Sequence, residues 1–99
     1  MAHEVAIRRK AQKQLARVHP QDRDRVGAAA FGLSDDPRPR GSRKMRGTGG
    51  AEDRRIAVGD YRVVYRVEEP HPDRPEPEEG EPSGLVTVLA VGHRQGIYG

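Results

Sequence analysis

The chain has 99 residues, no cysteine, a net charge of +3 at pH 7 and a sequence pI near 9.7. Its length is that of one domain with one small core, and the lack of cysteine excludes a disulfide framework and cysteine-based zinc sites. The N-terminal residues contain no apolar signal region, and no run approaches the length of a membrane span, so we expect a cytoplasmic protein without membrane contact.

The charge is distributed unevenly along the chain. Residues 68–82 contain seven acidic residues and one arginine, so the rest of the chain has 17 basic and 8 acidic residues, a net charge of +9. A folded body this positive favours a polyanionic partner, although high arginine content alone is only weak evidence for nucleic-acid binding.

The first third of the chain predicts a strand followed by two helices. Residues 4–8 alternate apolar and polar side chains, which is typical of a short strand. From about Arg9 the apolar spacing becomes helical, and this helix should end before Pro20, because a residue that precedes proline disfavours the helical conformation. A second helix is expected from Pro20 to about residue 35. The apolar stripes of the two helices are Ala11, Leu15 and Val18, and Val26, Ala29, Ala30 and Leu33.

Residues 54–67, RRIAVGDYRVVYRV, predict a β-hairpin whose two-residue loop is Gly59-Asp60. Val58 then pairs with Tyr61, and cross-strand partners share a face of the sheet. The apolar face would carry Ile56, Val58, Tyr61, Val63, Tyr65 and Val67. The opposite face, called here the basic face, would carry Arg55, Ala57, Arg62, Val64 and Arg66. Such a face is either an ordinary solvated surface or a surface for binding phosphate.

The remaining segments complete the predicted fold. Residues 37–51 are predicted to be a basic loop, and residues 69–83 a disordered, acidic, proline- and glutamate-rich loop that either solubilises the protein or covers the basic face. Residues 85–91 are apolar on both faces except at Thr87, which indicates a central strand. We therefore expect one α+β domain over residues 1–99, with an N-terminal helix pair packed on a twisted, mostly antiparallel sheet of about four strands.

Four motifs resemble the RelE/ParE superfamily of toxins from bacterial type II toxin–antitoxin systems. They are RKMRG (43–47), RIAVGDYRVVYRV (55–67), VLAVGHR (88–94) and Ile97-Tyr98, and they occur in the order found in that superfamily. The resemblance to RelE-type members implies a ribosome-dependent endoribonuclease that cleaves mRNA without a metal or small-molecule cofactor. A ribose 2′-hydroxyl would attack the adjacent phosphodiester, which requires proton transfer and stabilisation of charge on phosphate.

The resemblance also implies roles for individual residues. Arg62 matches the phosphate-binding arginine, Arg94 matches an arginine that supports the leaving group, and Tyr98 matches a tail tyrosine that stacks on a base. The expected phosphate- or RNA-binding residues are Arg55, Lys44, Arg46, Arg54 and Arg66. The histidines are scattered without ligand spacing, so no metal site is expected.

One position departs from the superfamily pattern. Ala57 occupies the second basic position of the first hairpin strand, where the family has a residue able to move a proton. Either a nearby basic residue (Arg54, Arg66, Lys44 or Arg46) substitutes, or general-base catalysis is impaired. An impaired protein would be a slow toxin or a member of the ParE branch, whose members inhibit DNA gyrase without cutting RNA. A third alternative is a degenerate toxin that only binds antitoxin. The partners implied by the resemblance are a cognate antitoxin, the ribosome and mRNA.

Overall fold

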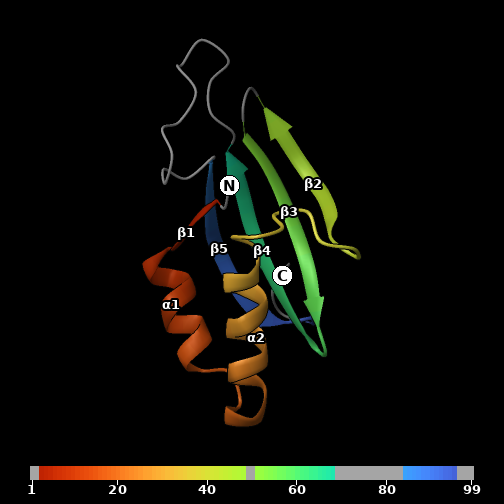
Figure 1. Ribbon diagram of the computed structural model, residues 1–99. Helices are drawn as coiled ribbons and strands as arrows, with labels where there is room; N and C mark the ends of the chain where they lie inside the picture. Colours follow the sequence, from red (N-terminus) through yellow and green to blue (C-terminus); the bar gives the residue numbers. More distant parts are fainter. Residues whose placement is uncertain (1–2, 49–50, 69–83, 96–99) are drawn as a thin grey trace.

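The computed structural model describes residues 3–48, 51–68 and 84–95. Its elements are β1 (Glu4–Ile7), α1 (Arg9–Ala16), α2 (Pro20–Gly32), β2 (Arg43–Thr48), β3 (Ala51–Val58), β4 (Tyr61–Glu68) and β5 (Leu85–His93). The strands form a twisted sheet in the order β1-β5-β4-β3-β2 (Figure 1). Only β1 runs parallel to its neighbour β5, and the other described pairs are antiparallel. The α+β fold with a helix pair on a mostly antiparallel sheet is therefore confirmed.

The predicted number of strands was too low by one. Residues 43–48, which were expected to belong to a loop, form the edge strand β2 and pair with β3. Arginine, lysine and glycine have little intrinsic preference for strands, so local sequence does not predict this element. Pairing with the neighbouring strand stabilises it instead. A bulge at Met45, which is 44% exposed, interrupts the register between Lys44 and Arg46.

The predicted hairpin register is confirmed. Val58 pairs with Tyr61, Ile56 with Val63 and Ala57 with Arg62, around a turn in which Gly59 adopts a φ of 60°. A positive φ is a conformation that glycine adopts at little cost, and it allows the tight reversal between the strands.

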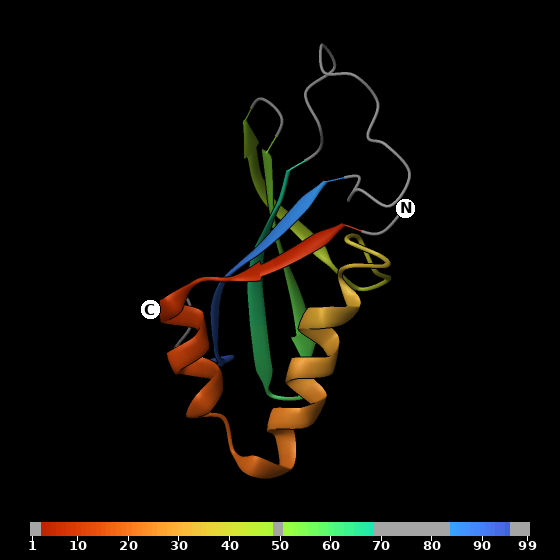
Figure 2. The same cartoon turned by 60° about the vertical axis from the view of Figure 1, so that its left-hand side comes forward.

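Both helices lie on one face of the sheet, as the two views in Figures 1 and 2 show. Helix α1 packs on β5, and α2 packs on β3 and β4. The core between these layers is small and apolar. Its members are Ala11, Val18, Val26, Ala30, Leu33, Ile56, Val58, Val63, Tyr65, Val67, Val86, Val88 and Val91. The opposite face of the sheet carries no helix and includes the basic face of the hairpin.

Neither described helix is long and apolar enough to cross a membrane. The predicted disorder of residues 69–83 and the position of Tyr98 lie outside the described residues.

Candidate nucleic-acid interface

An open cavity of about 640 Å³ lies on the helix-free face of the sheet, near the turn between β3 and β4. Its lining residues are Gly41, Arg43, Arg55, Ala57, Arg62, Arg94 and Gln95. Four of these are arginines, and the described lining contains no carboxylate. The cavity is therefore a concentrated positive surface of a size that suits a small number of phosphate groups.

Strand pairing explains why the arginines meet. Arg43 and Arg55 are cross-strand partners between β2 and β3, so their side chains share the basic face. Arg62 lies in the next row of the sheet, between Ala57 of β3 and Gly92 of β5. Because both of these neighbours are small, the surface around Arg62 is hollow rather than flat.

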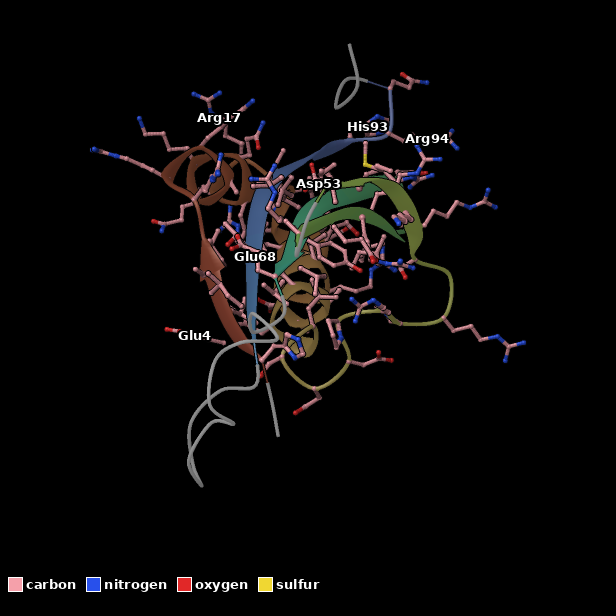
Figure 3. All side chains as sticks on the ribbon, turned by 90° about the horizontal axis from the view of Figure 1, so that it is seen from above. Glu4, Arg17, Asp53, Glu68, His93 and Arg94 are labelled. Atoms are coloured by element: carbon pink, nitrogen blue, oxygen red, sulfur yellow. The ribbon has the colours of Figure 1, made fainter. Side chains whose placement is uncertain are left out.

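Arg94 reaches the same cavity from the end of β5. Its backbone N–H donates a 2.8 Å hydrogen bond to the carbonyl oxygen of Asp60, which ties the residue to the hairpin turn. The side chains of Arg94 and Asp60 are 55% and 68% exposed and 3.9 Å apart, so their ion pair is weak. On the other face of the strand, the rings of His93 and Tyr61 meet edge to face with centroids 5.8 Å apart. Figure 3 shows Arg94 beside His93 and separate from α1.

Arg62 makes its described hydrogen bonds to neutral groups. Its Nη1 donates to the carbonyl oxygens of Gly59 at 3.1 Å and Tyr61 at 2.9 Å. These contacts hold the guanidinium over the hairpin turn without cancelling its charge. The remaining N–H groups of a guanidinium can then donate to an incoming anion.

Arg66 lies on the same face of β4 but has a different environment. It is four residues beyond Arg62, or roughly 13 Å along the strand. Its Nε donates to Asp53 at 2.7 Å and its Nη2 donates to the same carboxylate at 3.3 Å. Donating these hydrogen bonds to the Asp53 carboxylate raises the pKa of Arg66 above its ordinary value. Asp53 precedes the predicted hairpin residues 54–67, and it comes to lie opposite Arg66 because β3 extends back to Ala51.

Arg54 lies on the face that the helices cover, not on the basic face. It pairs across the sheet with the buried Tyr65 and has a side chain that is 15% exposed. Its Nη1 donates to Glu52 at 2.6 Å, and its Nη2 and Nε donate to the Ser42 hydroxyl at 2.8 and 3.2 Å. Arg54 is thus occupied by internal contacts.

This internal cluster holds the loop that carries Gly41 and Arg43 into the cavity. Ser42, bound by Arg54, lies between these two residues, and the hydroxyl of Tyr65 donates to the carbonyl oxygen of Pro37 at 2.8 Å. Burial raises the pKa of Tyr65 above its ordinary value. The hydrogen bond from Arg54, aided by the charge of Arg38, holds the pKa of Glu52 below its usual value despite partial burial. The cluster is a structural support behind the basic face.

The remaining expected residues are placed as follows. Lys44 is exposed and is the cross-strand partner of Arg54, so it does not line the cavity. For Arg46 the structure describes the backbone, which pairs with Asp53, and not the side chain. The structure therefore brings together Arg55, Arg62 and Arg94 of the expected set, and separates Arg54, Arg66 and Lys44 from them.

Sequence reasoning missed Arg43, Gly41 and Gln95, which also line the cavity. Arg43 stands at the start of the RKMRG motif, and its cross-strand position opposite Arg55 follows only once residues 43–48 are known to be a strand. Among the described residues, no group of three or more His, Asp or Glu side chains could hold a metal ion.

Comparisons with known proteins agree with this architecture. The family model described as the ParE toxin of the type II toxin–antitoxin system parDE matches residues 5–98. No match was found among curated proteins. An archaeal RelE structure, from the RelE–RelB complex of Pyrococcus horikoshii OT3, superposes with a TM-score of 0.73 at 25% identity, covering 95% of this chain and 97% of that chain.

Two further structures share the fold. The toxin–antitoxin complex RelBE2 of Mycobacterium tuberculosis gives a TM-score of 0.65 at 26% identity, covering 95% of this chain and 100% of that chain. A mutant of the toxin RelE from E. coli in the free state gives a TM-score of 0.62 at 19% identity, covering 99% of this chain and 90% of that chain, and it supports the fold alone.

Proposed function

Because the chain belongs to the ParE toxin family, and so to the RelE/ParE superfamily of type II toxins, we propose that it inhibits growth by cleaving mRNA on the ribosome. The observation that carries this proposal is the convergence of Arg43, Arg55, Arg62 and Arg94 around one cavity on the helix-free face. Cleavage would proceed by attack of a ribose 2′-hydroxyl on the adjacent phosphodiester, which leaves a 2′,3′-cyclic phosphate and a free 5′-hydroxyl.

The cavity supplies what this reaction needs at phosphorus. Negative charge grows on the non-bridging oxygens as the nucleophile attacks, and fixed guanidinium donors stabilise that charge. Arg62 is best placed for this role, because its described contacts are to neutral carbonyl oxygens and leave its charge uncancelled beside the hollow that Ala57 and Gly92 border. Arg94 would approach the leaving oxygen from the end of β5, while Arg43 and Arg55 would hold the flanking backbone.

The described lining of the cavity contains no good general base. Arginine stays protonated at neutral pH, so it is a poor general base, and Ala57 contributes no ionisable group to the cavity. We therefore propose an enzyme in which charge stabilisation and positioning carry most of the rate. Tyr98, which lies outside the described residues, would supply stacking on a base and assist proton transfer.

A ParE-like inhibitor of DNA gyrase is the second candidate. The matched family model is that of a ParE toxin, and Ala57 removes a basic group from the cavity, so both observations favour a protein that binds without cutting. In that case the four arginines would bind an anionic surface and would not act on a phosphodiester.

The proposed partners follow from the same comparisons. Structural neighbours from Pyrococcus horikoshii and Mycobacterium tuberculosis are toxins in complex with RelB-type antitoxins, which supports a cognate antitoxin for this chain. The ribosome and mRNA are the partners required by the proposed reaction, and a protein that acts on them would work in the cytoplasm.

The test is cleavage of a defined mRNA in vitro, with and without programmed ribosomes, by the wild type and by two variants. Arg62→Ala should lower the cleavage rate by at least a hundredfold, the scale of loss seen when one preorganised donor is removed. Arg66→Gln, the matched control on the same strand and face, should retain most of the rate because Arg66 is already bound to Asp53. Mapped ends should fall within codons.

Three results would count against the proposal. Intact mRNA together with gyrase-dependent DNA breaks would support the ParE-like candidate. Equal losses in Arg62→Ala and Arg66→Gln would mean that the cavity is not the site. The absence of both cleavage and gyrase inhibition, with antitoxin binding retained, would support a degenerate toxin.

A further inference from the structure

Helix α1 carries a second group of cations that the cavity does not use. The chain has no acidic residue from position 5 to position 21, and five exposed basic side chains occur within this segment. We call this group the α1 basic row; its members are Arg8, Arg9, Lys10, Lys13 and Arg17.

At the start of α1 the row does not stabilise its own helix. Arg8 is the N-cap of α1 and makes no side-chain capping hydrogen bond, and the first turn has no acidic residue. Cations at Arg9 and Lys10 oppose the helix dipole, which favours negative charge at that end. Arg9 and Lys13, four residues apart, repel each other in addition. A helix built only to cover β5 would gain stability from acidic residues in its first turn, whereas Lys13 in the last turn and Arg17 at the C-cap have the sign that the dipole favours.

The row is also separate from the cavity. Helix α1 packs on β5 from the helix-covered face of the sheet, whereas the cavity opens on the other face near the hairpin turn. In Figure 3, Arg17, the C-cap residue of α1, lies well apart from Arg94. A ligand held by the row therefore contacts a different region of a large partner, or a different partner.

We propose that the α1 basic row binds the phosphate backbone of double-helical RNA. The choice of RNA over DNA rests on the proposed function, which places this toxin on an RNA-rich particle. The other features of the partner follow from the side chains that α1 presents.

A protein partner fits this surface poorly. Protein interfaces centre on buried apolar and aromatic anchors. Among the described residues the large apolar side chains that are exposed are Phe31 and Met45, and neither lies on α1. The exposed side of the helix offers charge without an anchor, which matches a phosphate backbone.

A single-stranded partner also fits poorly. Recognition of unpaired bases uses aromatic side chains on which the bases stack, and α1 has none. From Arg9 to Arg17 the helix rises by about 12 Å, so the row faces roughly three or four phosphates of one duplex strand. The contact would read duplex charge and shape, without reading sequence.

The test measures binding of a blunt RNA duplex of about 20 base pairs, long enough for a contact that spans more than one groove. Fluorescence anisotropy across roughly 50 to 200 mM salt gives the slope of log affinity against log salt concentration. Three proteins are compared: the wild type, Lys13→Gln/Arg17→Gln, and the control Arg25→Gln/Arg40→Gln. Both double variants lose two charges from exposed residues, but only the first removes them from the row. The duplex contains no single-stranded segment and no ribosome, so the result does not depend on whether the protein cleaves mRNA.

Lys13→Gln/Arg17→Gln should reduce the magnitude of the slope by about 1.5 to 2 and weaken duplex binding roughly tenfold, because each phosphate contact contributes about 0.9 to the slope. The control should keep the wild-type slope to within about 0.5. Circular dichroism would check that α1 remains folded in both variants.

Several outcomes would overturn the inference. Equal slope changes in the two variants would show a general effect of net charge. If Arg62→Ala weakened duplex binding as much as Lys13→Gln/Arg17→Gln does, the duplex would bind in the cavity. Tighter binding to a DNA duplex of equal length would remove the reason for choosing RNA. If Lys13→Gln/Arg17→Gln bound the duplex as the wild type does but bound the antitoxin more weakly, the row would be a protein interface.

Discussion

Replacing Ala57 by lysine tests whether the cavity lacks only a proton-transferring group. Ala57 is exposed, lines the cavity and pairs with Arg62 across the sheet, so a longer side chain at this position enters the cavity without displacing core residues. We expect the free energy of unfolding to change by less than about 0.5 kcal/mol, as for other surface substitutions.

The neighbouring arginines would prepare the new amine for catalysis. Each guanidinium about 7 Å away in water-like surroundings disfavours the charged ammonium by roughly 0.6 kcal/mol. Arg43, Arg55, Arg62 and Arg94 line the same cavity, so all four charges favour the neutral amine. Their charge lowers the pKa of the introduced lysine below its usual value, towards the range in which a general base works.

We therefore expect Ala57→Lys to raise the single-turnover rate of mRNA cleavage on programmed ribosomes by about a hundredfold, the lower end of the range for general acid–base catalysis. Ala57→Arg is the matched control, because it adds the same charge but cannot give up a proton at neutral pH. Ala57→Lys should raise the cleavage rate constant measured at saturating ribosome concentration. Ala57→Arg should change only the affinity for programmed ribosomes.

Two results would refute this reasoning. An equal gain in Ala57→Lys and Ala57→Arg would show that added charge, not proton transfer, limits the rate. No gain in Ala57→Lys, with mRNA binding and folding intact, would show that the reacting phosphate does not sit beside Ala57.

Two further predictions concern the cluster behind the cavity. Tyr65→Phe should lower the free energy of unfolding by about 1 to 2 kcal/mol in urea denaturation, because it leaves the carbonyl oxygen of Pro37 without its 2.8 Å hydrogen bond inside the fold. Tyr61→Phe, which removes an exposed contact of 3.4 Å to the N–H of His19, should cost little, and equal losses in the two variants would contradict the role given to Tyr65. The lowered pKa of Glu52 means that the unfolded chain binds a proton more readily than the folded one, so this contribution to stability is present above about pH 4.5 and is lost as the pH falls further. Glu52→Gln should remove that part of the acid dependence when melting temperature is followed from pH 6 to pH 3, and an unaltered dependence would show that the Arg54 contact does not stabilise the carboxylate.

The hairpin shows how much the sequence alone could determine. Alternation with a period of two, together with a Gly-first loop, specifies both the register and the apolar face, because a slip by one residue would bury Arg55 and Arg62. The same local signals specified the two helices and the central strand. The sequence alone therefore assigns Arg55 and Arg62 to one face, and the structure confirms that they share it.

The composition of the cavity depended on contacts between distant segments. Arg54 is occupied by Glu52 and Ser42, and Arg66 is occupied by Asp53. Local sequence patterns do not predict these contacts. These partners lie on the extension of β3 and on the loop before β2, both of which have weak local propensity.

The sequence by itself determined which residues could form strands and helices and which arginines share a face, because these features follow from local periodicity and turn chemistry. Tertiary structure alone decided that Arg43 joins Arg55, that Arg94 meets Arg62, and that Ala57 and Gly92 leave a hollow between them. The physical reason is that cross-strand register, bulges and sheet twist depend on the free energy of the whole sheet, which no single segment encodes.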